Sequence, residues 1–557
     1  MRKTILGIVA CVLVLVMVFS ACQSETTTTT TSTTSTTSTT STSTSTTSTS
    51  TTSTASFDYP IPFNPNAQHG GTMIINHNGA ISSLGAPSDA NVYQRVLRPV
   101  FEPLLVCDAN ENLAPWLATS WSTSDDGKAV TLKLRQGVKF SDGTDFNAEA
   151  VKFNFEDYRD KQGNNAPVLF KITSFDIPDP YTIIVHLSEP DVTFLLGLAQ
   201  SSYGLMASPT AVQKPTTPDN VAELHMVGTG PFLFVSWQRD NYAEYKANPN
   251  YWQPGKPYLD VLRWNFIADQ TANILAFKSG QANVTFTLDP VDAINLKNDG
   301  YNVGEVALNY IHCLVPDGSN PDSPFAKLEV RQALEYALNK GELAAVGSSY
   351  FHIAIQHAKP SDAYYDPTIT PRDYNLAEAK RLLASAGYPD GVPIVVVTGQ
   401  SMRVDTQNLI LGQIKAAGFD VTKVDIQPSG AYFATLTKGW KGTTPGVGSL
   451  LMAAFPDADN LSMTISRFGG AMYPDQYQIA ELRDAWNSCA GILDDDQRNA
   501  AIRSLIREIF DTAAVIPYQY DTSRYATDSQ AQGWGEYFNS NNNADFFQPA
   551  ELWLKTK

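Results

Sequence analysis

Alternating apolar and polar side chains predict a strand followed by a helix in the first half of the chain. Residues 130–134 alternate with period two, as in a strand that buries one face. Asn147 then stands at an N-cap position, and apolar residues from Val151 to Tyr158 recur at helical spacing. Residues 183–187 alternate again, and we expect this strand to pair with the first in a small insertion domain.

From residue 324 onward the pattern changes to amphipathic helices, each followed by an apolar strand. One helical stripe begins at Asn375 and stops at Gly387, and a second stops at Gly418. A further long helix is predicted over residues 497–512. Because helix, glycine stop and strand recur in this order, we expect an α/β lobe with mixed sheets flanked by helices.

The N-terminus has the pattern of a secretory signal followed by a polar tether. An apolar run over residues 5–19 follows two basic residues and is too short to favour a membrane-spanning helix. The four residues that end at Cys22 resemble a bacterial lipobox, which implies cleavage before Cys22 and acylation of its thiol. Residues 26–54 are all Ser or Thr and cannot build a core. We therefore expect a signal peptide at 1–21 and a lipidated, disordered linker at 22–56.

The charge balance argues against two kinds of partner. The chain has 39 Lys and Arg against 56 Asp and Glu, a net charge of −17, and loss of the signal peptide would remove two more positive charges. Nucleic acid and anionic membrane surfaces are bound by basic patches, so neither is expected as a docking partner.

Motifs for catalysis, cofactors and metals are missing from the sequence. It contains no GxSxG, no HExxH and no GxxxxGK[ST], and its seven histidines are scattered. Cys107, Cys313 and Cys489 have irregular spacing, which favours free thiols over a disulfide framework or a metal site. Gly228 and Gly230 are better explained by a turn than by a phosphate cradle. We expect no enzymatic activity, no cofactor and no metal.

One long segment carries a family resemblance. Residues 113–156, LAPWLATSWSTSDDGKAVTLKLRQGVKFSDGTDFNAEAVKFNFE, resemble the signature of the family 5 solute-binding proteins, the dipeptide- and oligopeptide-binding lipoproteins of ABC importers. The one departure that we note is Ala150, where the family usually has Asp, and we interpret it as a change on the helix surface. Further landmarks follow in the family's order, at residues 227–232, 246–252, 255–258, 330–340 and 516–518.

The resemblance implies a two-lobed fold like that of periplasmic binding proteins, with a ligand cleft between the lobes. Lobe I would be discontinuous, built from residues 57–107, 211–305 and 525–557. Residues 108–210 would form the insertion domain, and residues 306–524 would form lobe II. The protein would act as a monomer on the outer face of the cell membrane, with the ABC permease and ATPase subunits on separate chains.

The resemblance also suggests which residues line the cleft. In peptide-binding relatives an Asp pairs with the α-ammonium of the ligand, and our ungapped alignment places Ala454 at that position. Since a desolvated ammonium needs a counter-charge, either Asp457 takes over or the ligand has no amine. The candidate ligand-binding residues are Asp89, Phe286, Thr287, Asp289, Tyr310, His312, Trp440, Met452, Ala454, Phe455 and Asp457.

Two ligand classes remain open. The overall resemblance favours oligopeptides. Oligosaccharides are the alternative within the same family, because stacking on aromatic faces can replace ion pairing. The aromatic residues that could stack are Phe286, Tyr310, Tyr432 and Trp440, although core packing explains each of them equally well.

Overall fold

In the computed structural model, the chain from Thr54 to Lys557 forms one compact unit. The structure describes residues 60–79, 81, 83–89, 94–107, 112–161, 166–217, 219–286, 288–347, 350–360, 362–400, 402–428, 431–432, 435, 442, 444–456, 480–534 and 548–556. Cys22 and the Ser/Thr linker lie outside these residues, so their predicted roles stay predictions.

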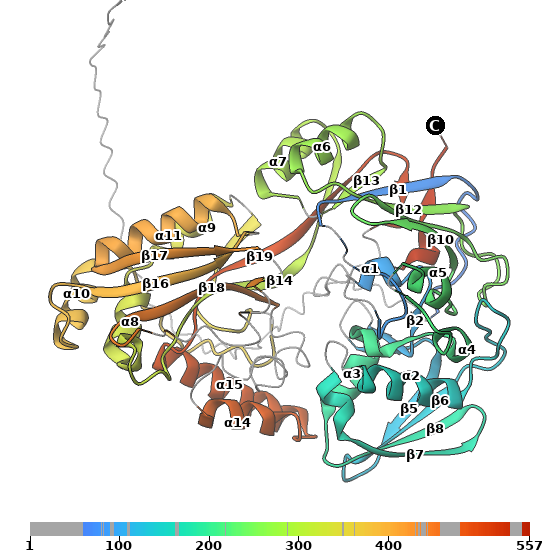
Figure 1. The fold of residues 1–557 in the computed structure, drawn as a ribbon, viewed down its shortest axis with the longest axis horizontal. Helices are drawn as coiled ribbons and strands as arrows, with labels where there is room; N and C mark the ends of the chain where they lie inside the picture. Colours follow the sequence, from blue (N-terminus) through green and yellow to red (C-terminus); the bar gives the residue numbers. More distant parts are fainter. Residues whose placement is uncertain are drawn as a thin grey trace, which may run out of the picture. The chain divides into compact units, whose positions relative to one another are not determined.

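A large mixed sheet runs through this unit (Figure 1). Its strands follow the order β10 (Phe232–Gln238), β11 (Tyr242–Ala247), β12 (Val261–Phe266), β1 (Thr72–His77), β13 (Val284–Phe286), β19 (Ile516–Thr527), β14 (Asn302–Pro316), β18 (Gly448–Pro456), β16 (Val392–Gly399) and β17 (Phe419–Gln427), with β15 (Phe351–Ile353) also paired to β19. The long antiparallel pair β14 and β19 joins the two halves, because β19 pairs with β13 near one end and β14 pairs with β18 near the other.

A second sheet of four antiparallel strands confirms the predicted pairing. Its order is β5 (Ala118–Thr123), β6 (Ala129–Leu134), β8 (Thr182–Leu187) and β7 (Ile172–Asp179), and Val130 lies opposite Val185. Helix α2 (Ala148–Asp160) packs on this sheet. The side chain of Asn147 caps it by accepting a 3.0 Å hydrogen bond from the Ala150 amide. The strand and the helix predicted here are both confirmed.

The prediction for Ala150 was wrong. Its side chain is only 4% exposed and belongs to the apolar cluster beneath the small sheet. The first turn of α2 enters the core instead of facing solvent, as the neighbouring buried residues Ala148 and Val151 also indicate. Ala150 is therefore a core position, and the departure from the family pattern lies in the packing.

The later part of the chain is the predicted α/β lobe. Helices α8 (Leu328–Tyr336), α10 (Leu376–Ser385) and α11 (Val404–Ala417) share an apolar cluster with one face of β16 and β18. Helices α14 (Ala480–Cys489) and α15 (Asp495–Thr512) contribute to the cluster on the other face (Figure 1). Gly418 ends α11 with a φ of 108°, the left-handed conformation that favours glycine. The mixed α/β class is thus confirmed.

The described residues also form several shorter elements. The further helices among them are α1 (Gln94–Leu97), α3 (Val192–Gln200), α4 (Pro209–Val212), α5 (Val221–His225), α6 (Gln270–Lys278), α7 (Pro290–Asn298) and α9 (Lys340–Val346). The short strands among them are β2 (Glu102–Pro103), β3 (Leu105–Cys107), β4 (Leu113–Pro115), β9 (Leu205–Met206), β20 (Ala531–Gln532) and β21 (Trp553–Leu554).

After β19 the chain returns to pack against the first strand of the sheet, β1. Trp534 and Leu552 join the apolar cluster built around β1 and β12. The lobe and insertion boundaries themselves stay predictions. Across the described ranges, none of the helices combines the length and the apolar character needed to cross a membrane.

Glycines 228 and 230 sit where the backbone leaves no room for a side chain. A Cβ on Gly228 would lie 2.1 Å from the Val100 carbonyl oxygen, and one on Gly230 would lie 2.6 Å from it. These glycines therefore serve a close approach between two backbone segments, which agrees with the predicted turn.

Candidate functional site

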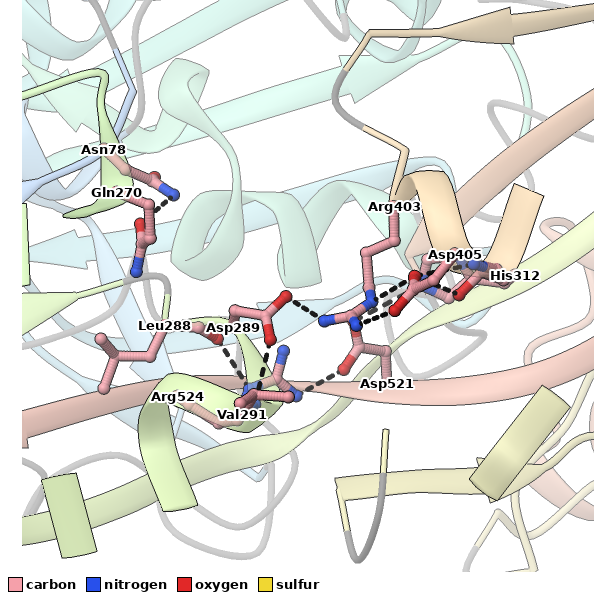
Figure 2. Close-up of polar contacts among 11 residues, drawn as sticks. Asn78, Gln270, Leu288, Asp289, Val291, His312, Arg403, Asp405, Asp521 and Arg524 are labelled. Carbon is pink, nitrogen blue, oxygen red and sulfur yellow. Dashed lines mark hydrogen bonds and ion pairs between the residues drawn. The ribbon is translucent and has the colours of Figure 1, made fainter. Parts of the chain in front are cut away.

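Charged side chains gather where the sheet passes from one half to the other (Figure 2). They come from strands β14 and β19 and from the N-terminal ends of α7 and α11. We call this group the crossing cluster and define it as Asp289, His312, Arg403, Asp405, Asp521 and Arg524.

The two carboxylate oxygens of Asp289 make different interactions. Asp289 is the N-cap of α7, where its Oδ1 accepts a 2.9 Å hydrogen bond from the Val291 amide. Its Oδ2 accepts a hydrogen bond from Nη1 of Arg403, which stands just before α11. This ion pair links the end of the β13 connection to the α/β lobe (Figure 2).

Arg403 is held by carboxylates on both sides. Its Nε lies 3.1 Å from Oδ1 of Asp405, in the first turn of α11, in addition to the Asp289 pair. Burial lowers the pKa of Arg403, but the hydrogen bonds to Asp405 and Asp289 outweigh it and raise that pKa. The side chains of Arg403 and Asp289 are 23% and 33% exposed, so a ligand can still reach this ion pair.

The second half of the cluster lies on the crossing strands. Arg524 donates from Nε to the Leu288 carbonyl oxygen at 2.8 Å and from Nη1 to Asp521 Oδ1 at 2.6 Å. His312 Nε2 lies 3.5 Å from Asp521 Oδ2. Burial acts to raise the pKa of Asp521, but His312 and Arg524 outweigh it and lower that pKa. Asp521 therefore carries its charge at neutral pH.

The crossing cluster presents partly exposed charges of both signs. Such a group can bind the charged ends of a ligand by ion pairs and hydrogen bonds. It offers no arrangement for metal binding, since the described residues contain no group of three or more His, Cys, Asp or Glu that could hold an ion.

The structure brings several predicted site residues together. Asp289 and His312 belong to the crossing cluster. In the strand register, Tyr310 lies opposite Asp521, and His312 lies opposite Ala454, while Phe455 follows on β18. The side chains of Tyr310, Ala454 and Phe455 lie outside the described part of the chain, as do residues Thr287, Trp440 and Asp457 altogether.

Three other predicted residues lie elsewhere or point into the core. Phe286 is completely buried, stacks on His77 at 6.1 Å between ring centroids, and lies beneath the guanidinium of Arg95. Met452 is also completely buried. Asp89 accepts hydrogen bonds from His225 Nδ1 at 2.5 Å and from Lys161 Nζ at 2.7 Å, so its carboxylate ties α5 to α2.

Sequence reasoning missed Arg403, Asp405, Asp521 and Arg524. The available signal was weak: Arg403 and Asp405 flank the start of an amphipathic helix, where an acidic residue is favoured and an arginine is not. Asp521 and Arg524 are charged residues within an otherwise buried strand. An unpaired charge in a buried strand costs several kcal/mol of folding free energy, so a charged residue there indicates that a partner of opposite charge lies nearby.

Comparison with protein families gives one match over most of the chain. Residues 112–478 match the model of the bacterial extracellular solute-binding proteins, family 5 Middle. The glutathione-binding protein GsiB of Shigella flexneri is 33% identical over 309 residues, which cover 55% of this chain and 59% of that relative. The chain thus matches little more than half the length of this curated relative.

Solved structures of low sequence identity share the fold. DppA from Helicobacter pylori, in complex with the peptide STSA, has a TM-score of 0.74 at 23% identity, covering 88% of this chain and 99% of that one. AppA from Bacillus subtilis, in complex with a nonapeptide, has a TM-score of 0.72 at 19% identity, covering 88% and 100%. NikA from Brucella suis, in complex with Fe(III)-EDTA, has a TM-score of 0.73 at 20% identity, covering 86% and 100%. The predicted two-lobed fold of periplasmic binding proteins is confirmed.

Proposed function

Since the chain belongs to the bacterial extracellular solute-binding proteins of family 5, we propose that it captures oligopeptides outside the cell and delivers them, unchanged, to an ABC permease. The permease and its ATPase would be separate chains, because this sequence contains no phosphate-binding loop. Binding and release would not involve catalysis.

The crossing cluster is the observation that carries the peptide assignment. A free peptide has an ammonium at one end and a carboxylate at the other, and each loses its hydration on binding. Arg403 offers a guanidinium for the carboxylate, and Asp289 offers a carboxylate of the opposite sign within the same ion pair. Paired charges of both signs suit a zwitterionic ligand better than a neutral one.

An oligosaccharide remains the competing ligand, because aromatic stacking could replace ion pairs. Of the four aromatics considered for stacking, Phe286 has no exposed face to offer a sugar ring. Tyr432 donates its hydroxyl to the Met452 carbonyl oxygen at 2.8 Å. The burial of Phe286 therefore removes one of the aromatic faces on which a sugar could stack.

The proposal is tested by thermal shift of the full chain against mixed peptides, glutathione and β-linked oligosaccharides. Glutathione is included because a relative 33% identical over 309 residues is named for binding it. A ligand at a hundredfold excess over its dissociation constant stabilises the folded state by about 2.7 kcal/mol. We expect this from peptides and not from sugars. Stabilisation by sugars alone would reject peptide uptake, and turnover of any compound would reject a pure binding role.

We also propose that Cys22 anchors the protein to the outer face of the membrane. In cells fed a labelled fatty acid, the wild-type protein is expected to carry label and to sediment with membranes. The Cys22→Ala variant should lose both properties, because the acylated thiol is then absent. Cys107→Ala is a matched control that removes a cysteine far from the lipobox-like segment and should keep the label. Equal labelling of wild type and Cys22→Ala would reject the anchor.

A further inference from the structure

A cavity of about 590 Å³ has no part in the proposed transport function. It is walled by residues 135–138, by residues 252–254 with Lys256, and by residues 60–63. None of these residues belongs to the crossing cluster. The volume falls within the range of about 300–1,000 Å³ that is usual for small-molecule sites.

Arg135 gives this cavity a fixed cation. Its Nε donates to the Trp116 carbonyl oxygen at 2.9 Å, and its guanidinium lies 4.6 Å above the centre of the Trp252 ring. Among the residues that the structure describes, no acceptor is hydrogen-bonded to its two terminal nitrogens. The group is therefore held in place by one nitrogen and one ring face, with two donor nitrogens available.

The other charge in the wall is already balanced. Lys256 forms an ion pair with Glu551, and both side chains are 1% exposed. Lys256 Nζ also donates to the Ile61 carbonyl oxygen at 2.7 Å. Arg135 forms no ion pair among the described residues and is thus the cation in the wall that can attract a ligand, although the buried carboxylate of Glu102 also acts on it.

Apolar side chains that contain rings line much of the remaining wall, next to the polar side chains of Gln136 and Gln253. Phe63 is 49% exposed, and Pro60, Pro62 and Pro254 add flat apolar surface beside Trp252. Flat rings of a ligand pack well on proline and aromatic faces. Since the wall combines such surfaces with one guanidinium, it fits a ligand that carries an apolar ring and an anionic group.

We propose that this cavity binds a small ring-bearing monocarboxylate, with the carboxylate on the terminal nitrogens of Arg135 and the ring against Phe63 and the prolines. A guanidinium can hold a carboxylate by two parallel hydrogen bonds. The site is distinct from the crossing cluster and does not depend on what the crossing cluster binds.

The test titrates 3-phenylpropionate and its neutral amide, 3-phenylpropanamide, into the full chain by calorimetry. The titrations use the Arg403→Gln background, which removes the other guanidinium to which we assign a carboxylate. We expect the acid to bind with a dissociation constant of about 1 mM or lower and the amide to bind at least tenfold more weakly. No binding of the acid at 10 mM, taken as about ten times that constant, or equal binding of acid and amide, would overturn the proposal.

Variants at Gln136 and Phe63 locate the site while Arg135 itself is left unsubstituted. Gln136 and Phe63 are exposed, so substitutions there should preserve the fold. Gln136→Glu should weaken the acid at least tenfold by supplying Arg135 with a competing carboxylate, whereas Gln136→Lys should tighten it. Phe63→Ala should weaken it severalfold, while Phe170→Ala, at a 57% exposed position elsewhere, should not. Unchanged affinity in both Gln136→Glu and Phe63→Ala would place the ligand outside this cavity and overturn the proposal.

Discussion

Replacing Glu102 with Gln is expected to lower the free energy of unfolding by about 3 kcal/mol, although the two side chains have nearly the same shape. Glu102 is 3% exposed, and its carboxylate accepts four hydrogen bonds. Oε1 accepts from Trp116 Nε1 at 2.9 Å and from the Tyr251 hydroxyl at 2.6 Å. Oε2 accepts from Trp252 Nε1 and from the Thr229 hydroxyl, both at 2.8 Å.

The cost arises because each carboxylate oxygen faces an indole N–H, which can only donate. The Thr229 and Tyr251 hydroxyls can rotate and accept a hydrogen bond from the new amide, but Trp116 and Trp252 cannot. In either orientation of the substituted side chain, its NH₂ group therefore opposes an indole N–H in a buried site. Urea unfolding followed by tryptophan fluorescence measures the loss. Glu508→Gln, at an exposed position on α15, is the control and should change the unfolding free energy by less than about 0.5 kcal/mol.

A double-mutant cycle tests this explanation directly. Trp252→Phe removes the indole N–H that faces Oε2, so the amide introduced by Glu102→Gln can then point toward Thr229. The Glu102→Gln change should cost at least about 1 kcal/mol less in the Trp252→Phe background than in the wild type, a coupling of the size usual for contacting residues. If the changes in unfolding free energy caused by the two substitutions are additive, the glutamine NH₂ group does not face the Trp252 indole N–H as we propose.

Elements whose signals are local could be predicted from the sequence. The strand at residues 130–134 and the capped helix after Asn147 follow from a period of two and from one side chain next to the first turn. The end of α11 at Gly418 could be predicted because a helix often ends on a residue with left-handed backbone conformation, which favours glycine. In each case the information lies within a few residues of the element, where propensity and periodicity act.

Positions that depend on distant contacts could not be predicted in the same way. Ala150 carries no sign that the first turn of α2 faces the core, because that depends on the sheet packed beneath it. Arg403 meets Asp289 across 114 residues of sequence, and Arg524 meets Leu288 across 236. Such pairs form because β14 and β19 run from one half of the sheet to the other and bring distant segments of the chain together. The spacing of residues along the chain carries no sign of them.

The placement of Phe286 illustrates the same limit for the site. An aromatic residue at the end of an apolar strand suits both a core and a stacking surface. The structure places it in the core cluster, where it contacts His77 and Trp534. A nearby polar residue, Asp289, instead remains accessible because it caps α7 just beyond the end of β13.

The Arg403→Gln variant is expected to bind peptides with a free C-terminal carboxylate about a hundredfold more weakly than the wild type, a loss of about 3 kcal/mol. The same peptides with an amidated C-terminus should lose less than threefold, because they have no carboxylate for Arg403 to hold. Isothermal titration of both peptide sets measures the difference. Arg239→Gln, at an exposed position between β10 and β11, removes the same charge elsewhere and should leave both affinities unchanged.

Asp289 provides the opposite test of the same ion pair. Its Oδ2 occupies Nη1 of Arg403, so a ligand carboxylate has to compete with it or share the guanidinium. Asp289→Asn keeps the α7 cap, since Asn caps helices as well as Asp does, but it removes the competing charge. Peptides with a free C-terminal carboxylate and an acetylated N-terminus should then bind severalfold more tightly. Peptides that also carry a free N-terminal amine should gain less, because Asp289 is the carboxylate that we assign to the ligand's ammonium. Equal affinities of wild type and Asp289→Asn for both peptide sets would contradict this role of the ion pair.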